Sequence, residues 1–539
     1  MPATDPKLPD NVRSLPESVE PAQESAPDPN ATDVYAIHGA DPEVLAYAMA
    51  KYSRSSLTMR ESLAQISAQR AEQFLNTFYF QYGHRSIADL AHIPFAIERL
   101  SLLAAIDLVD EQRWDGQERS TRYQDFRRSG WFTPDFGPNT SVYTASIEAL
   151  FAAYERTGAR MFDALRDSLP RPEVMKPEAY ERTLKARAFD VARYLLPLAT
   201  NTSLGQIVNA RTLETQVSRL LSSAFPEIRS LGLRLRAAAV EPAWNVGATA
   251  ARDLVQRSRE MSDPVLAADL EAWLLREVKT APTLVKYASR STYLIDTAAH
   301  LSAAAADLLG GVSMDAAPLV DLLDDDEPLE VELATSLLYP HCHYPYRQIR
   351  SHVAALTENG REELIALGSR YRGPHDELLR SFSAGSVFRF DILMDIGGFR
   401  DMHRHRRCVQ LLQGYTDQHG YDDPVCPGQP TIAEAGFEQD FRSTMASTYE
   451  AFRALQSKGQ EPKVCSQYLL PLATRRRAMF KMDFAEALYI SELRSGAAGH
   501  FSYRRVAWEM YLAIARRHPA LHKLFRVEDV YEPIDLLRR

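Results

Sequence analysis

The sequence has little cysteine. Its 539 residues include four, Cys342, Cys408, Cys426 and Cys465, and none of them belongs to a Cys-x-x-Cys pair. This scarcity excludes a disulfide framework and argues against a cysteine zinc site. We interpret the four side chains as reduced thiols and expect a cytoplasmic protein.

Long apolar runs and excess positive charge are also missing. No stretch of 18 apolar residues occurs, and the N-terminus lacks a basic-then-apolar signal pattern, so neither a transmembrane helix nor a signal peptide is predicted. The net charge of −9 disfavours general binding to nucleic acids or anionic membranes. An apolar content of 45% and a charged content of 25% are those of a globular protein. Its length requires more than one domain.

One heptapeptide, YLLPLAT, occurs twice, at residues 194–200 and again 274 residues later at 468–474. Before each copy, at 92–113 and 386–407, a strand-like apolar stretch runs into a helix-like segment. A helical pattern follows each copy. Similarity at a fixed offset indicates a duplication. We therefore predict an α+β, helix-rich chain of two homologous halves, each with a small β-sheet flanked by helices.

The expected domain boundaries follow from composition. Residues 1–33 contain seven prolines among Asp, Glu, Ser and Ala, which is typical of a disordered tail. The first half is expected at 34–312 and the second at 328–539. Between them, residues 313–327 are rich in aspartate and are predicted to form an acidic linker.

A basic cluster lies in the second half at residues 400–407, RDMHRHRR. If this segment is helical, neighbours are rotated by about 100°, so Arg404, His405 and Arg406 spread over roughly 200° and can face two ligands or a ligand and a subunit. Guanidinium groups match phosphates and carboxylates. The alternative is an exposed basic helix end, which the helix dipole favours. A zinc site is not expected, because His403 and His405 diverge on a helix.

The first half has a different polar cluster at residues 116–128, GQERSTRYQDFRR. Glu118, Ser120 and Arg122 alternate, so an extended chain would present all three on one side. A carboxylate, a hydroxyl and a guanidinium suit the sugar and phosphate of a nucleotide. The alternative is an ordinary solvated loop.

Three further polar residues of the first half are candidates. His84 follows a glycine, although a lone histidine is more often structural than catalytic. Asn209 and Arg211 lie on an apolar segment, where buried polar groups need partners.

In this order, the segments resemble those of flavin-dependent thymidylate synthases. That family has a Gly-His segment, an Arg-His-Arg signature and an Asn/Gln-Glu-x-Ser-x-Arg-Tyr loop. Arg-x-x-Leu-Pro, Asn-Ala-Arg and Leu-Arg segments follow. The resemblance implies a homotetrameric enzyme with shared active sites, which uses FAD, NADPH and methylenetetrahydrofolate to convert dUMP to dTMP.

The two halves depart from this pattern in complementary ways. The first keeps Gly83-His84, the loop 117–123, Arg193 before Leu-Pro and Asn209-Ala210-Arg211, but reads Asp110-Glu111-Gln112 in place of Arg-His-Arg. The second keeps Arg404-His405-Arg406 and Leu493-Arg494 with His500 downstream. It has lost the nucleotide loop, and it has Gln467 in place of the arginine and Asp483-Phe484-Ala485 in place of Asn-Ala-Arg.

The resemblance therefore implies one composite site built by both halves. In it, Glu118, Ser120, Arg122, Arg193 and Arg404 bind dUMP, and Arg494 stabilises charge on the uracil during catalysis. His84, Asn209, Arg211, His405 and Arg406 contact FAD or folate. No metal is expected, and a homodimer would correspond to the family tetramer. Two alternatives stay open: a non-catalytic homologue that binds a flavin or nucleotide, and a nucleic-acid-binding protein that uses the basic cluster.

Overall fold

The structure is a computed structural model. It describes residues 37, 39–51, 58–65, 85–111, 113–261, 263–286, 288–292, 295, 319–322, 328–338, 346–370, 382, 387–405, 407–457 and 460–537. The predicted tail at 1–33 and the candidate residues His84 and Arg406 lie outside this set, as does Cys342. Cys408, Cys426 and Cys465 are buried free thiols.

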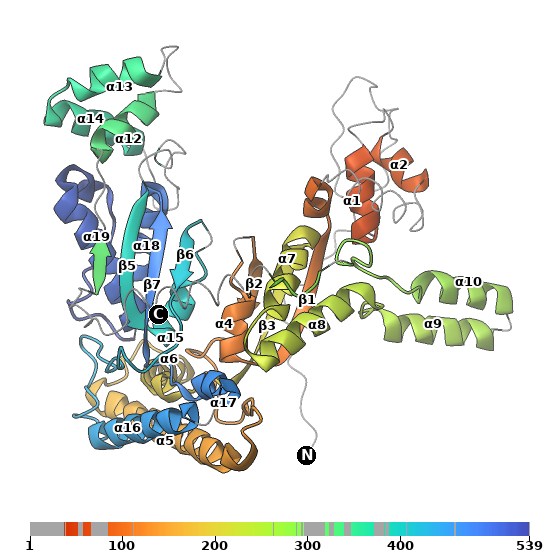
Figure 1. Cartoon of the computed structure of the whole chain (residues 1–539), viewed down its shortest axis with the longest axis horizontal. Helices are drawn as coiled ribbons and strands as arrows, with labels where there is room; N and C mark the ends of the chain where they lie inside the picture. Colours follow the sequence, from red (N-terminus) through yellow and green to blue (C-terminus); the bar gives the residue numbers. More distant parts are fainter. Residues whose placement is uncertain are drawn as a thin grey trace. The chain divides into compact units, whose positions relative to one another are not determined.

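Each half contains a small antiparallel sheet (Figure 1). In the first half, the order is β1-β3-β2, from β1 (His92–Ser101), β2 (Asp115–Glu118) and β3 (Asn201–Asn209). In the second half, the order is β4-β5-β7-β6, from β4 (Val320–Leu322), β5 (Phe388–Asp395), β6 (Val409–Leu412) and β7 (Arg475–Met482). The predicted α+β class is confirmed. Val320–Leu322, which we placed in the linker, forms an edge strand.

Helices surround both sheets. The first half contains α1 (Pro42–Lys51), α2 (Met59–Gln65), η3 (Arg85–Leu90), α4 (Leu102–Leu108), η4 (Gly137–Asn139), α5 (Thr140–Ser168), α6 (Pro177–Ala192), η5 (Arg193–Leu195), α7 (Ala210–Leu221), α8 (Pro226–Val240), α9 (Ala248–Glu260) and α10 (Pro264–Leu274). The second contains α12 (Leu329–Leu338), α13 (Tyr346–Ala354), α14 (Glu358–Ser369), α15 (Ile396–Met402), α16 (Glu438–Gln456), α17 (Gln460–Cys465), η8 (Ser466–Leu469), α18 (Phe484–Ser495), α19 (Phe501–Arg517) and η9 (Pro519–Leu524). Within the described residues, no helix combines the length and apolar character needed to cross a membrane.

Strand pairing repeats between the halves with constant offsets. Glu118 pairs with Leu204 in the first sheet, and Leu412 pairs with Ala478 in the second. Leu412 lies 294 residues after Glu118, and Ala478 lies 274 residues after Leu204. The same two offsets relate the pair Ser101–Asn201 to the pair Asp395–Arg475. Because a slip of one residue would turn every side chain to the other face, this agreement supports the duplication.

The two YLLPLAT segments pair with each other. Leu198 donates its backbone N–H to the carbonyl of Leu470, and Leu472 donates to the carbonyl of Leu196, both at 2.9 Å. Pro197 stands opposite Pro471 in the same bridge. Each copy therefore satisfies buried backbone groups of the other, as in an isologous dimer interface. The repeated heptapeptide marks the pseudo-two-fold axis between the halves.

The N-caps of α4 and α15 also correspond between the halves, but the acid and the hydroxyl of the capping contact are exchanged. Ser101 caps α4 and its hydroxyl donates to Glu227 of α8 at 2.6 Å. In the second half, Asp395 caps α15 and accepts from the hydroxyl of Ser502 in α19. The acid and the hydroxyl have changed places while the contact is kept. Such a contact needs one donor and one acceptor, whichever side supplies each.

The predicted helix through Arg407 is shorter than we expected. α15 ends at Met402, and His403 and Arg404 form a turn rather than a continuation of the helix. The carbonyl of His405 accepts from the Gln410 amide at 3.0 Å and from the Cys408 thiol at 3.2 Å, so local side chains replace the helical bonds. The expected helical arrangement of Arg404 and His405 is therefore wrong, and Arg406 lies outside the described residues.

Candidate active site between the halves

Ion pairs cross from one half to the other next to the candidate loop. At the end of β2, Glu118 forms an ion pair with Arg400 of α15, and both side chains are 8% exposed. Sequence reasoning expected Glu118 to contact a ligand and did not select Arg400. A carboxylate at the end of a first-half strand therefore pairs with an arginine in a helix of the second half.

Arg122 is buried and fully engaged at the same boundary. Its Nε donates to Oδ1 of Asp190 at 2.7 Å and its Nη2 to Oδ2 at 3.2 Å. From the second half, the Tyr503 hydroxyl accepts from Nη1 at 2.8 Å, and the carbonyl of Ala498 accepts from Nη2 at 3.1 Å. Burial alone would lower the pKa of Arg122, but Asp190 outweighs it and the pKa is raised. Arg122 is therefore always charged and held in a fixed orientation.

Arg193 lies directly after α6 and faces a different carboxylate. Its Nη1 and Nη2 both donate to Oδ2 of Asp401, at 3.3 and 3.4 Å, and Nη1 also reaches the Thr121 hydroxyl at 3.5 Å. Arg193 is 1% exposed, and its Nε has no hydrogen-bond partner in the described structure. A buried donor without a partner is unfavourable and points to a place for an acceptor.

Four guanidinium groups affect the pKa of Asp401, and one of them, that of Arg193, contacts its carboxylate directly. Burial raises the pKa of Asp401, but Arg193, Arg122, Arg404 and Arg494, in decreasing order, lower it and prevail. These are the four arginines predicted for the composite site, two from each half. Arg193 contacts Asp401 directly, and the guanidiniums of Arg122 and Arg494 lie 5.7 and 5.5 Å from the centre of the Tyr503 ring. Asp401 is a carboxylate that we had not selected.

Arg494 orients His405. In the last turn of α18, its Nε donates to Nε2 of His405 at 2.8 Å, and its guanidinium lies 5.5 Å from the centre of the Tyr503 ring. Since Nε2 accepts, the ring proton of His405 is on Nδ1, which lies 3.5 Å from Oε1 of Glu486. His500, downstream, is a buried N-cap of α19 with its pKa well below the usual value, chiefly because of burial.

Other predicted residues have local structural roles. The chain turns at Thr121, where the Ser120 hydroxyl accepts the backbone N–H of Arg122 at 3.2 Å. The side chain of Asn209 caps α7, and Arg211 pairs with Asp89 at 2.9 Å. Their partners belong to the first half, whereas His405 contacts second-half residues.

Two carboxylates that sequence reasoning missed share one signal. Asp190 lies three residues before Arg193, and Asp401 lies three residues before Arg404. On a helix this spacing puts an acid and a base on one face. Scanning for acids three residues before each candidate arginine would have found both. No such signal marks Tyr503, whose hydroxyl reaches Arg122 across the two halves.

In the first half, the residue equivalent to Asp401 forms ion pairs of its own. Asp107, 294 residues before Asp401, pairs with Arg219, which also donates to the carbonyl of Asp107 at 2.7 Å and to Glu111 at 3.1 Å. A cavity of about 190 Å³ remains nearby, and it is lined by Asp110, Glu111, His403, His405, Cys408, Val409 and Gln410. The acids that replaced Arg-His-Arg thus serve an internal cluster.

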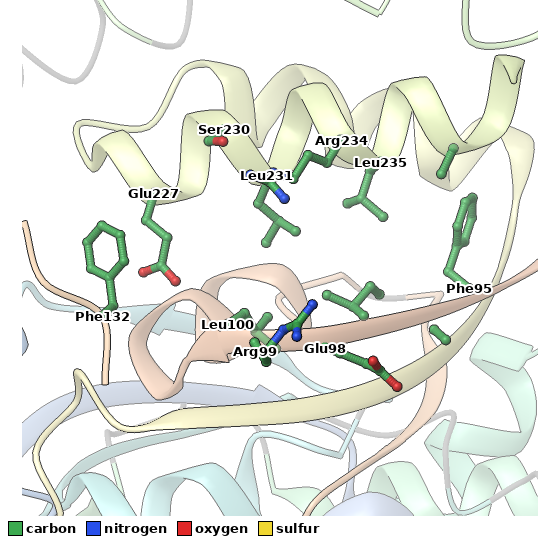
Figure 2. A pocket seen from close by; sticks show the side chains of 13 residues that line it. Phe95, Glu98, Arg99, Leu100, Phe132, Glu227, Ser230, Leu231, Arg234 and Leu235 are labelled. Carbon is green, nitrogen blue, oxygen red and sulfur yellow. The ribbon is translucent and has the colours of Figure 1, made fainter. Parts of the chain in front are cut away.

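A larger cavity, of about 410 Å³, lies between β1 and α8 (Figure 2). Figure 2 shows Phe95 and Phe132 at its two ends, with Leu231 and Leu235 facing β1 from α8. Arg99, at a bulge of β1, has a left-handed φ of 59°, which is uncommon for a non-glycine residue. Among the residues predicted for the site, none of those that the structure describes lines this cavity.

The chain is similar to known proteins in both halves. The family model described as "Thymidylate synthase complementing protein" matches residues 36–242 and 348–520, more than half of the chain. A "UPF0159 protein" of Chlamydia pneumoniae is 24% identical over 548 residues, which cover 94% of this chain and 93% of that protein. A similarly named protein of Thermoplasma acidophilum is 23% identical, covering 89% of this chain and 94% of its own length.

Two further similarities each cover just over a third of this chain. A "Flavin-dependent thymidylate synthase" of Clostridium tetani is 26% identical over 197 residues, 35% of this chain and 75% of that protein. The crystal structure of the UMP/dUMP methylase PolB from Streptomyces cacaoi, bound with 5-Br dUMP, aligns with a TM-score of 0.29 at 15% identity, covering 38% of this chain and 92% of that one.

Proposed function

We propose, from the premise that this chain belongs to the family of thymidylate synthase complementing proteins, that it methylates dUMP to dTMP at a single composite site. The observation that carries the proposal is that Arg193 and Arg122 of the first half contact Asp401 and Tyr503 of the second. Arg404 and Arg494 of the second half join them in lowering the pKa of Asp401. Two of these arginines come from each half, so neither half alone supplies the set. A dense group of guanidiniums is suited to a phosphorylated nucleotide.

Each arginine has a distinct proposed role. Arg193 binds the phosphate, because its unpaired buried Nε is available to an incoming oxygen. Arg122, held by Asp190 and Tyr503, adds fixed positive charge beside it. Arg404, which is exposed, contacts the nucleotide from the solvent side. Arg494 faces the uracil and stabilises the negative charge that develops on the ring.

The proposed cofactor is FAD, with NADPH and methylenetetrahydrofolate as co-substrates. Bound flavin supplies the redox chemistry of the transfer. Support for it comes from the family and from relatives named flavin-dependent thymidylate synthases. Asn209 and Arg211 have partners within the first half and His405 has a partner within the second. No residue-level step is therefore assigned to the flavin.

A second function, non-catalytic binding of a nucleotide or flavin, is favoured by one observation. The carboxylates of Asp190, Asp401 and Glu118 already pair with arginines at the composite site. A protein that kept its fold while losing turnover could retain such internal pairs. We also propose that two chains associate, since a chain with two family units corresponds to half of the family tetramer.

Tritium release tests the enzymatic proposal directly. Purified protein is incubated with dUMP labelled at C5, FAD, NADPH and methylenetetrahydrofolate, and tritium in water is counted. Release that needs all four components supports methylation. Binding of dUMP without release would favour the non-catalytic function, and Arg494→Lys serves as the matched catalytic control.

A further inference from the structure

We propose that Asp401 is an internal competitor of the substrate phosphate, which must displace this carboxylate from Arg193 in order to bind. The inference rests on the proposed function in that it takes a phosphorylated nucleotide as the ligand. It adds an autoinhibitory contact between α15 of the second half and the phosphate arginine of the first.

The geometry of the Arg193–Asp401 contact is that of a replaceable pair. Both terminal nitrogens of Arg193 share one oxygen, Oδ2, at 3.3 and 3.4 Å, rather than forming two parallel bonds. The Nε of Arg193 stays buried and unsatisfied. A guanidinium forms its strongest contacts through two parallel bonds. A phosphate oxygen can bind Nε while a second oxygen binds a terminal nitrogen, so phosphate satisfies Arg193 better than Asp401 does.

The neighbouring Arg122–Asp190 pair provides the contrast. There, Nε and Nη2 bind the two different oxygens of Asp190, at 2.7 and 3.2 Å, and both side chains are at most 7% exposed. That pair already has the parallel arrangement, and Asp190 belongs to α6 of the same half. The Asp401 side chain, by comparison, is 22% exposed and comes from the other half. Of the two carboxylates, Asp401 is therefore the one that can leave.

The first-half residue equivalent to Asp401 pairs with an arginine whose nitrogens are all engaged. Asp107 occupies the position equivalent to Asp401, and its partner Arg219 is also bound by the Asp107 carbonyl and by Glu111. Every nitrogen of Arg219 is thus engaged, whereas Arg193 keeps a free Nε. The two equivalent acids therefore have different partners: Asp107 pairs within its own half with Arg219, whereas Asp401 pairs across the halves with Arg193, whose nitrogens are not all engaged.

Charge gives the consequence for binding. Four guanidiniums need a counter-charge when no ligand is bound, and Asp401 supplies it from within. An incoming phosphate then replaces an existing anion instead of entering an uncompensated site. The apparent affinity for phosphate therefore falls as the fraction of molecules in which Asp401 pairs with Arg193 rises. Removing the charge of Asp401 should therefore increase anion affinity.

The test uses the full chain and the variant Asp401→Asn. Calorimetry with inorganic phosphate, dUMP and deoxyuridine compares the variant with the wild type. We expect phosphate and dUMP to bind at least about tenfold more tightly to the variant, and deoxyuridine, which has no phosphate, to bind equally to both. Asp190→Asn is the matched control, because it removes the same charge from a positioning pair and should weaken phosphate binding.

Unchanged or weaker phosphate binding by folded Asp401→Asn overturns the proposal, because Asp401 would then be holding Arg193 in place. A gain that persists when Arg193→Gln is combined with it also overturns it. Asp401→Ser provides a second neutral variant should the first not fold. If phosphate binds more tightly to the variant while neither protein turns over dUMP, the competitor stands and the proposed methylation fails.

Discussion

Arg400 and Glu118 form an ion pair although 282 residues separate them, and each side chain is only 8% exposed. Each belongs to a different half, so the pair is a buried contact between the halves. A buried pair is worth most when it is complete, since removal of one partner leaves an uncompensated charge.

Replacing Arg400 by Met should therefore lower the free energy of unfolding by about 3 kcal/mol, because Glu118 is left buried and unpaired. Urea denaturation measures the change. Arg156→Ala is the control: Arg156 pairs with Asp440 across the same two halves, but the side chains are 46% and 28% exposed. Loss of the Arg156–Asp440 pair should lower the free energy of unfolding by at most about 1 kcal/mol. Equal decreases in the two variants would show that burial does not determine the contribution of these ion pairs to stability.

Arg404→Ala should weaken dUMP binding by about 1.5–3 kcal/mol, the scale of a hydrogen bond to a charged group. Because Arg404 is exposed, the free energy of unfolding of this variant should stay within about 0.5 kcal/mol of the wild-type value. Arg122→Ala should weaken binding comparably and should also destabilise the fold, since it leaves Asp190 buried without its partner. Calorimetry and thermal unfolding separate the two effects. Normal stability of Arg122→Ala would contradict the structural role of its ion pair.

Asp395 should make stability depend on pH. Burial first, and then Asp422, raise the pKa of Asp395 from 3.8 to about 7. A carboxyl group whose pKa is raised on folding contributes stability that is complete below its unfolded pKa and is lost as the pH rises through the folded value. Between pH 4 and 7 this loss amounts to at most about 4 kcal/mol.

Asp395→Asn keeps a side-chain oxygen for the backbone N–H of Gly398 and removes the titration. Its stability relative to the wild type should rise steadily from pH 4 to 7, as measured by urea denaturation at each pH. A difference that is constant with pH would mean that Asp395 titrates near its ordinary value in the folded protein.

Growth complementation tests the proposed function in cells. Expressed in a thymidine auxotroph that lacks every thymidylate synthase, the wild type should restore growth without thymidine. Arg494→Ala should not, because the charge on the uracil would be uncompensated. Asp401→Asn should complement at least as well as the wild type. Failure of a soluble, flavin-loaded wild type would favour the non-catalytic homologue.

Much of the architecture could be predicted from local sequence. Alternating apolar residues indicated strands, and Asn209 at the start of an apolar helix caps α7. The helix through Arg407 could not be predicted correctly, because its end depends on side-chain bonds from Gln410 and Cys408 to the carbonyl of His405. The edge strand Val320–Leu322 was hidden within an acidic segment, since its pairing with β5 is a long-range contact.

The sequence by itself determined that the chain is duplicated, since the two copies of YLLPLAT and the order of segments are visible in one dimension. It also predicted that two arginines of each half serve one site, because each half had kept the part that the other had lost. Only the tertiary structure decided what stands between them. Asp401 reaches Arg193 across 208 residues, and Tyr503 reaches Arg122 across 381. These contacts between residues far apart in the chain follow no period in the sequence. They are set by strand register and helix packing, which exist only in the folded chain.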